Sequence, residues 1–295
     1  MAIDLDVLSQ VDKEYEREQA QLNSYLNQKV RSLMGDLEVN LSSPEQLSQV
    51  IYSCKLVDKK SWKSLMNIGV DHRGKPLPRP TMDLNSFREA VSSCFKRSKK
   101  VRSAKCPSCN GLGGYFKVKK DGTNFKKQTR CEVCAGKGTI YIDLEDRGGL
   151  NIPPRLSLAS AGGFKTDKNT LSMLLNEVTE PEAKKFIESI VRLSAIETYR
   201  SAFIEGIRKG IKSDGLLHAN FNQCITATGR LSSSSPNLQN MPKGRLFPVR
   251  KAFVSRFKGG ELVEIDYSQL EFRVAGILAT DEVVKREVES GFRHI

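Results

Sequence analysis

Two copies of the pattern C-x-x-C-x-G-x-G constrain this 295-residue chain more than any other feature. One copy runs from Cys106 to Gly113 and the other from Cys131 to Gly138. Paired C-x-x-C turns are typical of a tetrahedral zinc site with four thiolates, and glycine allows the tight turns that point backbone N–H groups at sulfur. We expect a structural Zn²⁺ without a catalytic role, and the alternative is a redox pair or free thiols. The expected ligands are Cys106, Cys109, Cys131 and Cys134.

A strongly basic segment surrounds these cysteines. From Lys96 to Arg130, twelve Lys and Arg residues stand against one acid, Asp121, and the whole chain has a net charge of +13. We therefore expect residues 96–145 to form a basic zinc-binding insertion. Its charge favours contact with the phosphates of nucleic acid, and a solvated charged loop is the alternative.

The sequence on both sides of the insertion has the periodicity of helices. Apolar residues at helical spacing predict a helix over residues 4–34, which Gly35 ends, and another over about 182–208. Ser43, Pro44 and Gln46 match a capping box with proline at the first helical position, so a helix is expected to begin there. Strands are expected over residues 216–223 and 261–265.

A single carboxylate, Asp266, stands at the end of the second predicted strand, and a helix is predicted to start near Ser268. An acid in this position is suited to Mg²⁺, which takes oxygen ligands and shares them with substrate phosphates. Phosphoryl transfer with two ions about 3.5–4 Å apart needs several bridging carboxylates. On residue types alone, an ordinary strand-end or capping acid therefore remains the alternative.

The segment Asp266-Tyr267-Ser268-Gln269-Leu270-Glu271-Phe272-Arg273 closely resembles the first palm motif of family A DNA polymerases, the bacterial polymerase I type. Residues 228–242 resemble the loop of that family that contacts the minor groove of primer–template DNA, and the order and spacing also match. The resemblance implies an α+β chain with a mainly helical thumb, an inserted zinc-ribbon-like module and an incomplete antiparallel-sheet palm. The expected boundaries are 1–95 and 146–214 for the thumb, 96–145 for the insertion, and 215–295 for the partial palm.

The same resemblance implies residue roles in a DNA-directed DNA polymerase. Asp266 would bind both Mg²⁺ ions, and the backbone carbonyl of Tyr267 would complete one coordination sphere. Glu271 would lie beneath the sugar of the incoming deoxynucleoside triphosphate and exclude a 2′-hydroxyl. Donors in the loop would contact minor-groove acceptors, which every base pair presents; a flexible polar connector is the alternative for this serine-rich loop. The nucleotide-binding set is Tyr267, Ser268, Gln269 and Glu271, and the DNA-binding set is Thr228, Arg230, Asn237, Gln239, Asn240 and Arg250.

The family also uses a helix with Lys, Arg and Tyr for the triphosphate and a second catalytic carboxylate, which these residues do not include. Residues 291–295 also depart from the family's Gly-x-Asp-x-His pattern. We therefore expect a split or truncated chain of phage type that is inactive without a C-terminal polymerase half. Some phage polymerases of this family carry a thumb insertion that recruits a processivity partner, so such a partner or DNA is expected at the insertion.

Two other functions compete with this interpretation. One is a zinc-stapled DNA-binding or interaction protein with a vestigial palm. The other is a co-chaperone, since the cysteine repeats resemble those of DnaJ-class proteins, but the chain has two repeats rather than four and no His-Pro-Asp sequence. No run of 18 apolar residues and no signal peptide occurs, so we expect no membrane partner and a cytoplasmic location, the host cytoplasm if the chain is phage-encoded.

Overall fold

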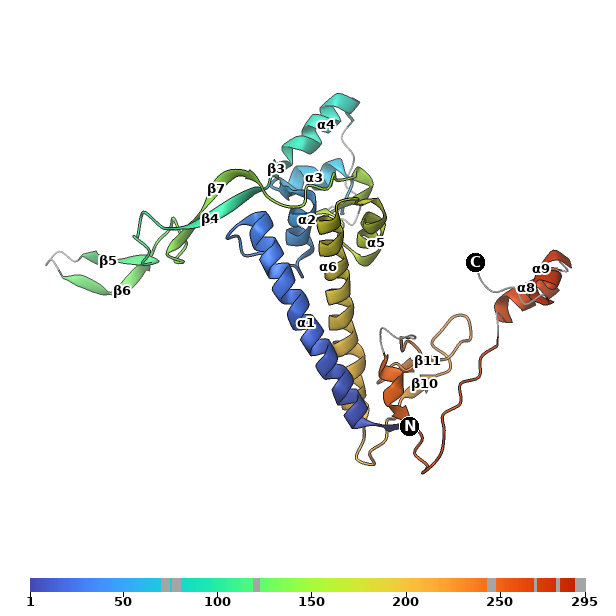
Figure 1. Cartoon of the computed structure of the whole chain (residues 1–295). Helices are drawn as coiled ribbons and strands as arrows, with labels where there is room; N and C mark the ends of the chain where they lie inside the picture. Colours follow the sequence, from blue (N-terminus) through green and yellow to red (C-terminus); the bar gives the residue numbers. More distant parts are fainter. Residues whose placement is uncertain are drawn as a thin grey trace. The chain divides into compact units, whose positions relative to one another are not determined.

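The computed structural model describes residues 1–69, 75, 81–118, 123–242, 248–267, 270–279 and 282–289 (Figure 1). Helices and small antiparallel strand pairs make up this structure, which confirms the predicted α+β class. The helices are α1 (Leu5–Met34), α2 (Pro44–Tyr52), α3 (Lys59–Leu65), α4 (Leu84–Ser93), α5 (Lys168–Glu177), α6 (Pro181–Tyr199), α7 (Glu205–Gly210), α8 (Leu270–Ala279) and α9 (Glu282–Glu289). The strands are β1 (Ala2–Ile3), β2 (Cys54–Leu56), β3 (Phe95–Arg97), β4 (Lys99–Lys105), β5 (Gly114–Val118), β6 (Asn124–Arg130), β7 (Thr139–Arg147), β8 (Ala159–Ser160), β9 (Gly163–Phe164), β10 (Asn220–Asn222), β11 (Ser232–Ser234) and β12 (Phe253–Val254).

The chain divides into two compact units. The central unit comprises Asp12–Ala202, and the terminal unit comprises Met1–Val11 together with Phe203–Ile295. None of the helices in the described part of the chain combines the length and the apolar character that a bilayer span requires.

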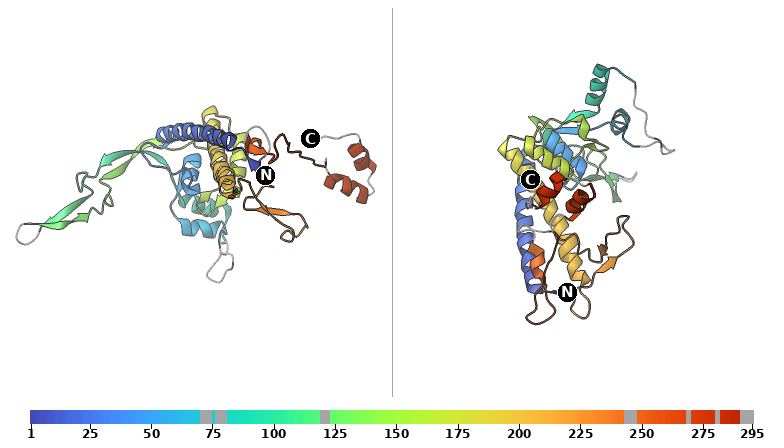
Figure 2. Two further views of the ribbon diagram at one scale, coloured as in Figure 1. Left: turned by 90° about the horizontal axis from the view of Figure 1, so that it is seen from below. Right: turned by 90° about the vertical axis from the view of Figure 1, so that its right-hand side faces the viewer.

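In the central unit, α1 and α6 lie side by side and antiparallel (Figures 1 and 2). Ion pairs show the direction, because the partner's number falls from 200 to 182 as the number along α1 rises from 12 to 29. These pairs are Asp12–Arg200, Glu18–Arg192 and Lys29–Glu182, with N···O distances of 2.7, 2.6 and 2.8 Å. Between the helices, apolar side chains at helical spacing are buried in one core, among them Leu26, Val30, Met34, Phe186, Ile190 and Leu193.

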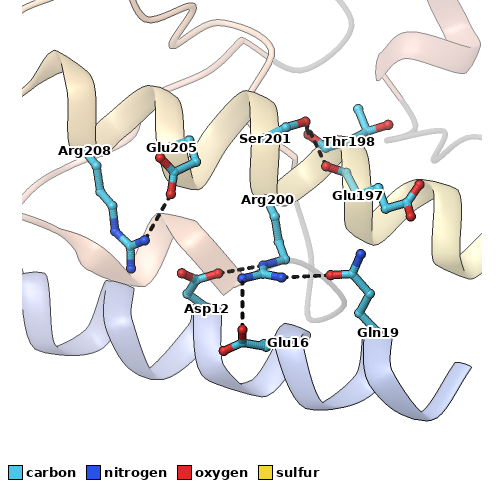
Figure 3. A network of polar contacts seen from close by, with 9 residues as sticks. All are labelled: Asp12, Glu16, Gln19, Glu197, Thr198, Arg200, Ser201, Glu205 and Arg208. Atoms are coloured by element: carbon cyan, nitrogen blue, oxygen red, sulfur yellow. Dashed lines mark hydrogen bonds and ion pairs between the residues drawn. The ribbon is translucent and has the colours of Figure 1, made fainter. Parts of the chain in front are cut away.

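The helix predicted over residues 4–34 is confirmed as α1, and Gly35, with a φ of 74°, follows its last residue. The helix predicted over 182–208 is interrupted. A π-helical turn over Arg200–Ile204 separates α6 from α7. The Ser201 hydroxyl donates to the carbonyl oxygen of Glu197 at 2.8 Å, as Figure 3 shows. Such a hydroxyl competes with the helical N–H for the same oxygen, but Ser189 makes the equivalent bond to Lys185 inside the regular helix α6, so this bond alone does not explain the turn.

Arg200 connects this turn to α1 within the central unit (Figure 3). Its guanidinium donates to the carboxylate of Asp12 at 2.7 Å and to the amide oxygen of Gln19 at 2.8 Å, and Glu16 lies at 4.0 Å. The Asp12 side chain is only 13% exposed. The pair is therefore shielded from solvent more than an ordinary surface ion pair, which strengthens its electrostatic attraction.

The helix α2 begins at the predicted residue, but the predicted capping box is wrong. Ser43 occupies the N-cap position and Pro44 is the first helical residue, yet the Ser43 side chain makes no capping hydrogen bond. The side-chain oxygen of Gln46 instead accepts a hydrogen bond from the N–H of Asn40 at 2.7 Å. The loop before the helix thus uses the glutamine that the capping box requires.

An aromatic cluster adds to the core of the central unit. The Trp62 ring is buried and packs edge-on against Phe95, with ring centroids 4.9 Å apart, and against Phe164, at 5.5 Å. Its indole N–H donates to the carbonyl oxygen of Ser160 at 2.7 Å, so its polar atom is satisfied. This core is independent of the cysteine turns.

Residues 99–147, called the arm below, extend from the helical part of the central unit (Figures 1 and 2). In the arm, β4 pairs antiparallel with β7, and β5 pairs antiparallel with β6. One cysteine turn lies between β4 and β5, and the other lies between β6 and β7. Asp36 attaches the arm, because its N–H donates to the carbonyl oxygen of Val101 at 2.9 Å and its carboxylate accepts from the N–H of Ser103 at 2.8 Å.

The terminal unit contains two strand pairs, β1 with β12 and β10 with β11. The strand predicted over 216–223 is shorter than expected, since β10 spans Asn220–Asn222 and Leu217 forms an isolated bridge with Ile211. The buried apolar residues of this unit include Leu8, Val11, Ile204, Ile207, Leu217, Met241, Val249 and Ala252.

The strand predicted over residues 261–265 does not form. No described strand pairs with this segment, and Val263 and Ile265 are 78% and 89% exposed. A strand depends on hydrogen bonds from a neighbouring strand, which an apolar alternation cannot replace. The helix expected near Ser268 is α8, which begins at Leu270, while Ser268 and Gln269 lie outside the described residues.

Candidate active-site segment and four-cysteine centre

Asp266 lies in the unpaired segment 261–267, shortly before α8, and its side chain is exposed. Tyr267 is 78% exposed. In the part of the chain that the structure describes, the one group of three or more converging His, Cys, Asp or Glu side chains is the four cysteines. An exposed carboxylate fits Mg²⁺ as one of several oxygen ligands. Among the described residues, Asp266 is therefore a single candidate ligand for Mg²⁺, and no other carboxylates converge on it to complete a site.

Arg230 and Arg250, two of the predicted DNA-contact residues, form ion pairs with acidic residues close to Asp266 in the sequence. The Arg230 guanidinium pairs with the carboxylate of Glu271, which stands in the first turn of α8. The Arg250 guanidinium lies 3.1 Å from the carboxylate of Glu264 and donates to the carbonyl oxygen of Met241 at 3.0 Å. The structure thus brings two cations close to the acidic segment that contains Asp266.

The serine-rich loop is held by its own hydrogen bonds. Ser233 of β11 is buried, and its hydroxyl donates to the carbonyl oxygen of Pro236 at 3.3 Å and accepts from the N–H of Leu238 at 3.2 Å. This bonding argues against a flexible connector.

The polar side chains of the loop remain at its surface. The Asn237 side-chain oxygen accepts from the N–H groups of Gln239 and Asn240 at 3.1 and 3.3 Å, which fixes the turn. Thr228, Asn237, Gln239 and Asn240 are all exposed. Their side-chain donors are therefore accessible to a ligand.

The four cysteines of the arm converge on one point. The sulfurs of Cys106 and Cys131 are 3.8 Å apart, those of Cys109 and Cys134 are 3.6 Å apart, and all four lie within 4.8 Å of one another. A tetrahedron with Zn–S bonds of about 2.3 Å has sulfur–sulfur edges of about 3.8 Å, whereas a disulfide requires about 2.05 Å. These residues therefore fit a tetrahedral metal ion and are not arranged as disulfides.

The two cysteine turns repeat the same backbone conformation. Positive φ angles occur at matching positions, Asn110, Gly111 and Gly113 in one turn and Ala135, Gly136 and Gly138 in the other. The N–H of Cys106 donates to the carbonyl oxygen of Gly138, and that of Cys131 donates to Gly113, both at 2.9 Å. A Cβ added to Gly113 would lie 2.5 Å from the carbonyl oxygen of Gly136. Glycine is thus required where the turns pack against each other.

Backbone dipoles also act on the sulfurs. The N–H of Gly138 donates to the Cys134 sulfur at 3.3 Å. A hydrogen bond from the Cys134 backbone lowers the pKa of Cys131 to about 6, whereas burial raises the pKa of Cys109 to about 11. A bound cation favours the thiolate form of every ligand, so metal binding would release the remaining thiol protons.

Two aromatic residues of the arm are exposed, and the sequence-based predictions gave them no role. Tyr115 and Phe116 of β5 are 46% and 49% exposed. The sequence pattern that could have indicated a role is two adjacent aromatic residues in a lysine-rich segment, because such a pattern is typical of single-strand binding. A count of charges alone does not detect it.

Residues 149–292 match the family model described as DNA polymerase family A. The DNA polymerase I of Mycobacterium tuberculosis is 37% identical over 124 residues, which are 41% of this chain and 13% of the relative. The thermostable DNA polymerase I of Thermus aquaticus is 39% identical over 130 residues, 43% of this chain and 15% of the relative. The DNA polymerase I of Streptococcus pneumoniae is 34% identical over 146 residues, 48% of this chain and 16% of the relative.

A solved structure has the same fold. The polymerase domain of Pol1 from M. smegmatis, in complex with DNA primer-template and dNTP, matches 99% of this chain and 33% of its own length, with a TM-score of 0.51 and 20% identity. The chain spans only 13–16% of the curated relatives named above. Those relatives are bacterial, and the expected phage origin stays a prediction. Residues 149–292 are therefore similar to DNA polymerases of family A.

Proposed function

We propose that this chain takes part in template-directed DNA synthesis, and that Asp266 is one of the carboxylates that hold the catalytic metal ions. The observation that carries the proposal is the segment Asp266–Arg273, which lies inside the region matched by the family model. The loop over residues 228–242 precedes it in the order and at the spacing expected for a family A polymerase.

In this proposal, Asp266 provides a carboxylate for two Mg²⁺ ions and Tyr267 provides its backbone carbonyl. Bound Mg²⁺ would stabilise the charge that develops on the transferred phosphoryl group. Glu271 excludes a 2′-hydroxyl beneath the incoming sugar, and Ser268 and Gln269 complete the nucleotide contacts. The ion pair between Arg230 and Glu271 supports a role for both residues near one substrate, since each can exchange its partner for a nucleotide or primer group.

The loop over residues 228–242 is proposed to hold the primer–template. Its exposed amides, Asn237, Gln239 and Asn240, suit the acceptors that line the minor groove. Thr228 belongs to the same contact surface, and Arg230 and Arg250 contribute positive charge for phosphates. The hydrogen bonds within the loop support this role, because a preordered loop loses less conformational entropy on binding.

The proposal assigns residues 1–95 and 146–214 to the thumb, 96–145 to the zinc-binding insertion and 215–295 to part of the palm. Two-metal transfer requires more carboxylates than Asp266, and a triphosphate requires cations. We propose that a C-terminal polymerase half supplies these groups. Residues 1–295 by themselves are expected to bind primer–template but not to extend the primer.

The four cysteines are proposed to hold a structural Zn²⁺. Four buried thiolates at tetrahedral spacing support zinc, which favours sulfur ligands and this geometry. Because such a site has no open position, the ion would stabilise the arm and would not contact substrate.

The decisive experiment measures primer extension by residues 1–295 combined with a polypeptide that carries the remainder of the polymerase domain. The variant Asp266→Ala should reduce extension about 10³-fold or more, since metal-ion stabilisation of phosphoryl transfer is worth several kcal/mol. The matched control is Glu261→Ala, which removes an exposed acid from the same unpaired segment and should leave extension unchanged.

Extension by Asp266→Ala at the rate of the unaltered chain would remove this residue from the mechanism. A second outcome favours the competing function. If the mixture binds primer–template but never extends it, the chain is better described as a zinc-stapled DNA-binding protein with a vestigial palm.

A further inference from the structure

Most of the net positive charge of the arm belongs to residues 114–130, which include its outer hairpin, β5–β6. Residues 114–130 contain six Lys and Arg residues and a single acid, Asp121. The base of the arm is different, because β7 places Asp143, Glu145 and Asp146 alongside the cations of β4. By its sequence, the hairpin therefore has more net positive charge than the base, which suits a polyanionic ligand.

Exposed rings accompany this charge. Tyr115 and Phe116 are neighbours on β5, so they point to opposite faces of the hairpin. Lys117 follows them and is also exposed. No second layer packs on this two-stranded hairpin in the part of the arm that the structure describes, so the rings are not part of a core. Aromatic rings next to cations can stack on unpaired bases while the cations contact the phosphates.

A hydrogen bond joins the hairpin to the second cysteine turn. Gly114 stands opposite Arg130 in the β5–β6 register, and the Arg130 guanidinium donates to the carbonyl oxygen of Ala135 in the second cysteine turn at 2.7 Å. Gly114 packs so closely that a Cβ there would lie 2.5 Å from the carbonyl oxygen of Thr129. The cysteine centre thus fixes the strand that carries both rings, which reduces the entropy lost when a ligand binds.

We propose that the β5–β6 hairpin is a binding site for single-stranded nucleic acid, with Tyr115 and Phe116 stacking on bases and Lys117 contacting phosphate. Duplex DNA is the less suitable ligand, because its bases are already stacked and cannot accept the rings. An unfolded polypeptide could cover the rings but would leave the cations without partners unless it were acidic. The inference does not rest on polymerase activity, since none of these residues belongs to residues 149–292.

The test uses the whole zinc-loaded chain and fluorescence anisotropy with a labelled 20-nucleotide oligo(dT), an oligo(U) of the same length, and a duplex. Tyr115→Ala/Phe116→Ala should weaken single-strand binding about 10-fold or more and leave binding of the fully paired duplex unchanged. Lys117→Ala should make the slope of log K against log[salt] less negative by about 0.7 for a single strand. Oligo(dT) against oligo(U) separates a DNA ligand from an RNA ligand.

The matched control for the aromatic change is Tyr141→Ala. Tyr141 lies on β7 of the same arm and is 42% exposed, but it stands beside the acidic residues, so its loss should not affect binding. Zinc content and circular dichroism verify that each variant keeps its fold.

Three results would overturn the proposal. One is unchanged oligo(dT) and oligo(U) affinity in the double variant. Another is an equal loss of single-strand and duplex binding, which would leave charge alone as the cause. The last is a loss of affinity for an unfolded model polypeptide with no loss for either oligonucleotide, which would assign the hairpin to protein binding.

Discussion

Removal of metal from the arm should unfold it while the helical core of the central unit stays folded. The perturbation is a strong chelator, or the substitution Cys109→Ser, which removes one sulfur of the tetrahedral set. In the described part of the arm, the buried cluster consists of the four cysteines with Ile140 packed partly against it. Two-stranded hairpins are marginal in water without further support, so the arm has little else to hold its turns together.

The magnitude follows from this arrangement. Four thiolates at tetrahedral spacing bind zinc with an apparent free energy of about 10–16 kcal/mol at neutral pH, which corresponds to a dissociation constant of about 10⁻⁷ to 10⁻¹² M. No hydrophobic core of comparable size exists among the described residues of the arm. Metal binding and folding of the arm should therefore be a single equilibrium.

Hydrogen exchange and metal analysis measure this directly. One zinc per chain is expected, and chelation should remove protection from the N–H groups of Cys106 and Cys131, which bond across the two turns. Amides of α6 should keep their protection, because the core of α1 and α6 does not include the cysteine cluster. A chain without bound metal whose arm amides remain protected would refute the reasoning.

Two further predictions concern the ion pairs between α1 and α6. Arg200→Ala should lower the free energy of unfolding, measured by urea denaturation, by about 2 kcal/mol, because it removes hydrogen bonds to the poorly exposed Asp12 and to Gln19. Arg200→Lys should restore only part of this stability, since an ammonium group lacks the planar fork of a guanidinium. The hydrogen bond from Arg192 lowers the pKa of Glu18, so this pair's contribution is present above the ordinary glutamate pKa of about 4.3 and is lost as the pH falls through the lowered value. The stability difference between the unaltered chain and Glu18→Gln should therefore be about 1 kcal/mol or less at pH 7, with Glu18 37% exposed, and should shrink toward pH 3; a difference that stays constant would contradict this account.

Local sequence patterns predicted the features that depend on nearby residues. The cysteine spacing predicted four converging sulfurs, because each turn carries its own two ligands and its own glycines. The apolar stripe predicted α1 almost to the residue, since a 30-residue helix with one buried face is specified by periodicity along its length. In both cases the residues that determine the structure lie close together in the sequence and follow a regular spacing.

Features that depend on distant partners were predicted less well. The strand expected over 261–265 has no strand partner among the described residues, and an alternation of apolar residues cannot reveal whether a neighbour exists. The Gln46 side chain accepts from the N–H of Asn40 in the preceding loop rather than from the N–H of the N-cap residue, and the capping pattern does not indicate which of these two donors it will use. The helix predicted through residue 208 changes to a π-helical turn at Arg200–Ile204, which apolar periodicity does not reveal.

The attachment of the arm explains how such a module can lie within a helical unit without disturbing it. Lys99 stands opposite Arg147 in the β4–β7 register, and the N–H of Gly148 donates to the carbonyl oxygen of Ser98 at 2.9 Å, so the two ends of the arm are adjacent. The arm therefore leaves and rejoins the helical part of the central unit at the same place. Its insertion requires the two chain ends to meet, and the entropy cost of this loop closure grows only slowly with loop length. Because the core of α1 and α6 contains none of the four cysteines, changes on the β5–β6 hairpin should leave that core intact. Binding measured on hairpin variants will consequently report on the hairpin itself.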